Sequence, residues 1–166
     1  MKKLLSLVIA LCCIYTMQAQ KFGYVNSQQL LVQSPEVKAA DAQLSTYQGE
    51  LIAKGETMVK SFEANYKKYV DIVNLGTLSK VEMAQREGDL AKEQQAIQQY
   101  EVEVQQKLVT KRETLYKPIL DKMKTTLDQI GTEMGYTMIF DSSAGGLLHA
   151  VEADDVMPIL KQRLGM

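Results

Sequence analysis

The sequence predicts an α+β protein in which a small β body, built from both chain ends, carries a long inserted antiparallel helical hairpin and a short C-terminal helix. A helical pattern runs from residue 35 to about residue 131 with one interruption, at 74–79. Short β-prone apolar segments flank this pattern on both sides. One break in so long a helical run is typical of a hairpin whose tip is the break. We therefore expect a body of residues 20–34 and 132–166 and an arm of residues 35–131.

Residues 1–19 have the organisation of a secretory signal. Two lysines begin the segment, an apolar run covers residues 4–15, and Ala19 is the small residue before a cleavage point. An apolar run of about 12 residues is shorter than the roughly 20 that span a bilayer. We expect export, cleavage near Ala19 and a mature chain that begins at Gln20.

The two cysteines of the chain, Cys12 and Cys13, fall inside this signal. A lipid anchor would need a small residue directly before the modified cysteine, and Leu11 or Cys12 stands there, so we interpret both as apolar signal residues. Their removal would leave no disulfide and no thiolate metal ligand. Without Lys2 and Lys3, the 19 basic residues fall to 17 against 20 acidic ones, a formal charge near −3. This charge does not favour nucleic acid as a partner.

The body is expected to contain three strands and a helix. One strand lies at 22–26 and leads into a helical turn, and a buried strand at 136–140 is followed by a second at 147–151, which predicts a β-hairpin. Residues 152–155 would cap a last helix that ends at Leu164 and tolerates a proline in its first turn.

Such a body buries too little apolar area to support a long hairpin as a monomer. We therefore expect self-association through the strands. The apolar residues that would form this oligomerisation surface are Phe22, Tyr24, Met138, Ile139 and Phe140.

The first arm helix begins with Ser34, Pro35 and Glu36, which supply a cap, a proline whose missing N–H is harmless, and an acidic first turn. Its apolar positions then alternate steps of three and four, as in a coiled coil, through Val37, Ala40, Leu44, Tyr47 and Leu51. Gly55 follows in this pattern at a position where a large apolar residue is expected. Beyond it the apolar steps lengthen toward an 11-residue period, which predicts a looser supercoil near the tip, over Met58, Phe62, Tyr66, Tyr69 and Val73.

The second arm helix is expected to begin near Ser79, because Ser79 and Glu82 form a capping box. Apolar residues then repeat at intervals of seven, at Met83, Leu90, Ile97 and Val104. Pro118 falls inside this helix, where it removes a backbone hydrogen bond and favours a kink between arm and body.

Residues with catalytic chemistry are sparse. Asp141, Ser142, Ser143 and the single His149 are not accompanied by a nucleophile elbow, an acid–base pair or a phosphate loop. We predict no catalytic site, no metal and no cofactor, because a metal site needs more ligands than this chain offers. The acidic residues at 152–155 are interpreted as helix caps.

The order of these elements resembles the Skp/OmpH family of periplasmic chaperones over nearly the whole mature chain. The residues that carry the resemblance are the strand 21–26, the helix start at 34–36, the long hairpin, the segment 135–141 and the helix opening at 154–156. The resemblance implies a homotrimer with a shared β body and three helical arms. It also implies that these arms enclose unfolded outer-membrane proteins without ATP and release them toward the outer-membrane assembly machinery.

Within that resemblance, the distal part of the first arm helix is the expected surface for clients, the unfolded proteins that a chaperone holds. Its apolar and aromatic residues exceed what one hairpin seam needs, and each could equally pack inside the hairpin. The candidates are Val59, Phe62, Tyr66, Tyr69, Val70 and Val73. Lys67 and Lys68 could contact anionic groups of membrane lipid or lipopolysaccharide, or simply form a solvated helix face.

Charge distinguishes this chain from well-known family members, which are strongly basic. Residues 40–125 contain 13 basic and 13 acidic residues, so no lipopolysaccharide site is transferred from the family. Two further hypotheses remain: a structural coiled-coil scaffold of the cell envelope, and a protein that lies on lipid through amphipathic arms. Suppression of aggregation would separate the chaperone from the scaffold.

Overall fold

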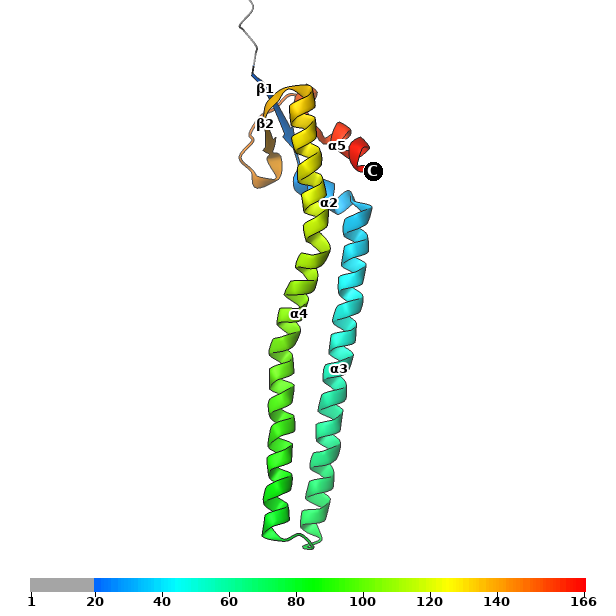
Figure 1. The fold of residues 1–166 in the computed structure, drawn as a ribbon, viewed down its shortest axis with the longest axis vertical. Coiled ribbons are helices and arrows are strands. Elements are labelled where there is room, and N and C mark those ends of the chain that lie inside the picture. Colours follow the sequence, from blue (N-terminus) through cyan, green and yellow to red (C-terminus); the bar gives the residue numbers. More distant parts are fainter. Residues whose placement is uncertain (1–19) are drawn as a thin grey trace, which may run out of the picture. The chain divides into compact units, whose positions relative to one another are not determined.

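The computed structural model describes residues 20–166, so the predicted signal at 1–19 lies outside the described residues. Two long helices, α3 (Pro35–Asn74) of 40 residues and α4 (Lys80–Met134) of 55, run side by side as an antiparallel hairpin (Figure 1). The expected α+β class with its hairpin is confirmed. The remaining elements are β1 (Lys21–Val25), α2 (Ser27–Gln33), β2 (Tyr136–Asp141), the 3-10 helices η1 (Ser142–Ala144) and η2 (Glu152–Asp154), and α5 (Met157–Leu164).

The chain divides into two compact units. The arm comprises Pro35–Ile119, and the body comprises the described residues up to Ser34 together with Leu120–Met166. The helix α4 continues through Pro118, directly before this division. The proline has no N–H to donate to the carbonyl four residues earlier, so the helix lacks one backbone hydrogen bond directly before the end of the first unit. The kink expected there stays a prediction.

The sheet of the body is a parallel pair, β1 with β2, in which Phe22 lies opposite Met138 and Tyr24 opposite Phe140. Parallel strands need a crossover connection, and here the whole helical hairpin is that connection. On its other side β1 forms a single parallel bridge from Tyr24 to Asp155, where the N–H of Val156 donates to the carbonyl of Tyr24 at 2.9 Å. The first strand is therefore central.

The predicted strand at 147–151, and with it the β-hairpin, is wrong: this segment has no regular secondary structure. After β2 the chain turns into η1, where the hydroxyl of Ser142 donates to the carbonyl of Val25 at 3.2 Å. Gly145, with φ of +75°, ends that turn. The sequence pattern shows β propensity, which produces a strand only where a sheet edge accepts its hydrogen bonds. In this chain the third position beside β1 goes to Asp155 instead.

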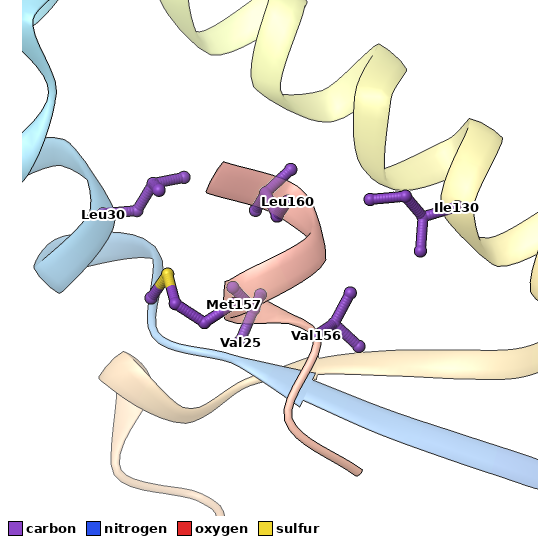
Figure 2. Close-up of a cluster of buried hydrophobic side chains, with 6 residues drawn as sticks. All are labelled: Val25, Leu30, Ile130, Val156, Met157 and Leu160. Atoms are coloured by element: carbon purple, nitrogen blue, oxygen red, sulfur yellow. The ribbon is translucent and has the colours of Figure 1, made fainter. Parts of the chain in front are cut away.

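The core of the body joins four elements, β1, α2, α4 and α5 (Figure 2). Its buried residues are Val25, Leu30, Ile130, Val156, Met157 and Leu160. Gly23 is required for this packing, because a Cβ there would lie 2.7 Å from a methyl carbon of Val156 and 2.9 Å from the ring of Tyr136. The helix α5 ends at Leu164 as expected, and Asp155 accepts from the N–H of Met157 at 2.8 Å.

The tip of the arm confirms the predicted capping box. The N–H of Ser79 donates to the carboxylate of Glu82 at 2.9 Å, and the N–H of Glu82 donates to the Ser79 hydroxyl oxygen at 3.3 Å. The hydroxyl of Ser79 also donates to this carboxylate, at 2.7 Å, and this bond, followed by that from the Ser79 N–H, lowers the pKa of Glu82. Gly76 has φ of +67°, the left-handed conformation that glycine adopts without strain.

The seam between α3 and α4 differs from the predicted stripe near the tip. Asn65, not Tyr66, lies in the seam: its side-chain amide donates to Glu93 at 2.8 Å, whereas Tyr66 is 53% exposed. Positions 62, 65, 69 and 72 are half-buried and continue the steps of three and four toward the tip, so the expected 11-residue period is wrong. Hydrophobicity could not reveal this register, because a polar residue that is hydrogen-bonded across the helices fits the seam.

Gly55 makes room for a tyrosine of the opposite helix. Tyr100 is only 6% exposed, and its ring lies 3.5 Å from where a Cβ on Gly55 would stand. Its hydroxyl donates to the carbonyl of Leu51 at 3.0 Å, and the ammonium of Lys54 lies 5.1 Å from its ring centre. The space beside the glycine that interrupts the apolar pattern is thus filled by an aromatic ring, which the sequence pattern did not indicate.

Substitution of Gly55 tests this packing. Gly55→Ala should raise the free energy of unfolding by about 0.5 to 1 kcal/mol, because alanine favours the helix and 3.5 Å is an ordinary contact. Gly55→Leu should lower it, because the space is occupied. Urea unfolding followed by circular dichroism measures both. Gly49→Ala, which meets nothing within 4 Å, should gain as much as Gly55→Ala, and a loss for Gly55→Ala would contradict the packing.

Candidate functional site

One face of the sheet exposes a cluster of apolar side chains. Strand alternation and register place Phe22, Tyr24, Met138 and Phe140 together on it, and we call this set the sheet face. Phe22, Met138 and Phe140 are 41%, 56% and 46% exposed, and the two phenylalanine ring centres are 6.1 Å apart. Such a cluster on a small body is typical of a protein interaction surface.

The fifth predicted oligomerisation residue, Ile139, lies on the opposite face of the sheet. Its register partner is Gly23, and its side chain packs against the core of its own chain. The alternation of side chains along a strand could have separated it from Met138 and Phe140, which point the other way. The structure therefore brings together four of the five residues and gives Ile139 a place in the core.

The strand β2 is an edge strand, since within the described residues only β1 pairs with it. A groove of about 590 Å³ lies beside it, between β2 and α4, with apolar walls from Met123, Leu127 and Ile139. Lys124 and Asp128, 3.3 Å apart, also line the groove. An unpaired strand edge beside an apolar groove can accept an additional strand through backbone hydrogen bonds.

The six candidate client-binding residues divide between the seam of the arm and its surface. Phe62 and Tyr69 are half-buried in the seam, and the hydroxyl of Tyr69 donates to Glu87 on α4 at 2.5 Å, which raises the pKa of Tyr69. Val59 and Tyr66 are exposed, at 39% and 53%, and the Tyr66 ring stacks on that of Phe62 with centres 6.2 Å apart. The last two candidates, Val70 and Val73, are half-buried.

The exposed residues belong to a regular row that the sequence reasoning did not identify. Ile52, which is 51% exposed, lies one heptad before Val59 on α3. The same interval of seven leads to Tyr66 and then to Val73. We call these four residues the outer row. A search for a second seven-residue repeat beside the seam could have found Ile52.

Lys67 and Lys68 are both exposed, as a contact with anionic groups would require. The charge around Lys68 is mixed, however. It lines a shallow pocket of about 160 Å³ together with Asn65, Tyr69, Arg86, Asp89, Leu90 and Glu93. The two acidic residues there reduce the attraction that the lysine offers to an anion.

The polar residues considered for catalysis shape the turn after β2. Asp141 accepts from the N–H of Ser27 at 3.1 Å, from its hydroxyl at 2.5 Å and from the N–H of Ser143 at 3.0 Å. Partial burial raises the pKa of Asp141, but these hydrogen bonds outweigh it and lower the pKa to about 2. His149 is exposed in the irregular segment 147–151.

Within residues 20–166, no group of three histidine, cysteine, aspartate or glutamate residues is arranged to hold a metal ion. No helix in this part of the chain combines the length and apolar character needed to cross a membrane.

Comparison with known proteins agrees with this architecture. A family model described as outer membrane protein (OmpH-like) matches residues 21–164. The chain belongs to the OmpH-like family. A crystal structure from Caulobacter crescentus CB15, described as "a putative outer membrane chaperone (OmpH-like)", shares its fold with a TM-score of 0.74 at 16% identity. The similarity covers 87% of this chain and 83% of that one. No curated protein matches this OmpH-like chain.

The hydrogen bonds to Asp141 predict a pH dependence for the body. Because the folded-state pKa is about 2 against an ordinary value of 3.8, their contribution is complete above pH 3.8 and is lost as pH falls through 2. Asp141→Asn should lower the free energy of unfolding at pH 7 by about 1 kcal/mol, a figure reduced for solvent exposure. The difference between variant and parent in urea unfolding should shrink toward pH 2. A difference that stays constant from pH 7 to pH 2 would refute this role.

Proposed function

We propose that this OmpH-like protein is an ATP-independent holdase of the periplasm that keeps unfolded outer-membrane proteins from aggregating. The observation that carries the proposal is the exposure of three outer-row residues, Ile52, Val59 and Tyr66, which the chain's own hairpin does not cover. Membership of the OmpH-like family and the chaperone description of the Caulobacter structure support the client class. The signal-like segment 1–19 supports export, and the proposal includes its cleavage near Ala19.

We further propose that copies assemble through the sheet face into a homotrimer. The exposed Phe22, Met138 and Phe140 supply apolar area, and the free edge of β2 can accept a strand of another copy. Leu148, in the irregular segment 147–151, is 98% exposed. Assembly beside this segment would bury Leu148. The number three rests on the family resemblance.

Client capture in this proposal depends mainly on apolar contact. The 13 basic and 13 acidic residues between 40 and 125 leave no net charge to attract a client over distance. Full burial of an apolar side chain contributes about 1.5 to 3 kcal/mol, and partly exposed residues such as Val59 and Tyr66 offer part of that. Several weak contacts of this kind hold an unfolded chain without a nucleotide-driven step. Contact of Lys67 and Lys68 with membrane lipid or lipopolysaccharide would be transient.

The second candidate function is a structural coiled-coil scaffold of the cell envelope. It is favoured by the polar contacts that fix the arm's register, from Asn65 to Glu93 and from Tyr100 to Leu51. A register fixed in this way suits a spacer as well as a chaperone arm. The aggregation assay described below distinguishes the two.

Assembly through the sheet face predicts different outcomes for neighbouring residues. Met138→Asp should yield folded monomers, because Met138 is 56% exposed and lies outside the chain's own core. Ile139→Asp should destabilise the body instead, because it replaces an apolar side chain that packs against the core with a charge. Sedimentation with circular dichroism separates the two results. If Met138→Asp has the mass of the parent assembly, the sheet face is not the interface.

Client capture predicts a contrast between apolar and basic substitutions. The protein should keep an unfolded β-barrel protein soluble without nucleotide, and replacing Val59 and Tyr66 with Ser should weaken this more than replacing Lys67 and Lys68 with Gln. Both pairs are on the exposed part of α3, so helix content should stay constant in circular dichroism. Raising salt from about 0.05 to 0.5 M should change affinity less than about tenfold.

Light scattering of the diluted client measures this capture. Equal precipitation with and without the protein would favour the scaffold. A steep loss with salt, or a larger effect of the lysine pair, would show that local basic charge governs capture.

A further inference from the structure

The helix α3 has a second coiled-coil pattern that its own hairpin does not use. The outer row, together with the seam positions 55, 62 and 69, forms a complete heptad series with steps of three and four. In that series Ile52, Val59 and Tyr66 are 51%, 39% and 53% exposed. An apolar face wider than one seam is typical of a helix that contacts two other helices. Only the partner on the seam side, α4, comes from the same arm.

The spacing of the outer row favours a helical partner. Seven helical residues advance about 10.5 Å, which is the interval between equivalent positions on a second helix packed alongside. An extended chain repeats its side chains on one face about every 7 Å, so an unfolded client contacts the row at single residues, whereas a helix matches the spacing of the whole row.

Charges beside the row favour another copy of the same helix. Glu56, Lys60, Glu63 and Lys67 alternate in sign along α3, and Lys60 pairs with Glu56 at 3.8 Å. Two carboxylates and two ammonium groups leave this edge without net charge, so a second copy of the same helix is not repelled along it. The equal numbers of basic and acidic residues over 40–125 also remove any net repulsion between arms.

We propose that, in the assembly without client, the outer row packs against the outer row of another copy, so that the arms cover their own client-binding surface. This inference rests on the proposed function. The exposed members of the row, Ile52, Val59 and Tyr66, are too few to supply the roughly 800 Å² per partner of a stable interface. The contact therefore needs copies tethered through their bodies, where effective concentrations reach about the millimolar range. A client that offers more apolar surface than the second arm displaces this contact between the outer rows.

Disulfide trapping tests the contact, because the chain from Gln20 onward has no cysteine. Val59→Cys places a thiol in the outer row, and Val102→Cys places a matched control on α4, where Val102 is 73% exposed. The assembly is oxidised at a dilution that prevents collisions between assemblies. Tethering through the bodies acts equally on both thiols, so the contact itself should make Val59→Cys form inter-chain disulfides at least about tenfold faster than Val102→Cys. Excess unfolded β-barrel protein should abolish this difference.

Charge reversal beside the row gives a second test. In the Val59→Cys background, Glu56→Lys with Glu63→Lys makes the edge uniformly positive and should slow disulfide formation about fivefold at low salt. Added salt should restore the rate. The control, Glu101→Lys with Glu113→Lys on α4, has the same change of net charge away from the row and should have less effect.

The outcomes separate this inference from the proposed function. If Val59→Cys and Val102→Cys react at equal rates while the client stays soluble, the self-covering contact is wrong and the holdase stands. If Val59→Cys reacts faster but the client neither slows it nor stays soluble, the holdase fails and self-covering of a client surface fails with it. If Val59→Cys couples only to a cysteine-bearing amphipathic helical peptide, the row binds a foreign helix and the inference is overturned.

Discussion

The parallel pairing of β1 with β2 is the constraint on which the rest of the body depends. It joins residues separated by the entire hairpin, and β1 must also accept the bridge from Asp155 on its other side. Gly23 permits this crowding because any side chain there would collide with Val156 and Tyr136. The two strands bring α2, α5 and the end of α4 around one small core, so the body closes only when both chain ends are present.

The arm is stabilised differently, by a long seam in which polar groups take part. Tyr100 fills the space at Gly55, Asn65 bonds Glu93, and Tyr69 bonds Glu87. A purely apolar seam would permit neighbouring registers of similar energy, whereas a hydrogen bond across the helices is lost when the helices slide. The arm thereby keeps one register and leaves Tyr66 on its surface. Apolar side chains become available to a partner because the seam has no place for them.

Both candidate surfaces are parts of the chain that its own packing leaves uncovered. The sheet has one face on the core and one face open, so Met138 and Phe140 remain exposed while Ile139, between them in sequence, packs partly buried against the core. On the arm, α3 has a wider apolar face than α4 can cover. Each surface is thus the uncovered side of an element whose other side is already packed. A contiguous apolar surface of this kind is typical of an interaction site, whereas exposure of single apolar residues is common by chance.

The sequence by itself determined the elements whose signals are local. Pro35 begins α3, the Ser79–Glu82 box begins α4, Gly76 marks the tip, and the strands on both sides of the arm were found because capping, turn geometry and β propensity act within a few residues. Tertiary structure alone decided the rest. It placed Asn65 rather than Tyr66 in the seam, filled Gly55 with Tyr100, left 147–151 without a strand and turned Ile139 inward. Each of these outcomes depends on contact with a residue distant in the chain. Periodicity and propensity describe only residues close together in sequence, so they do not report such contacts.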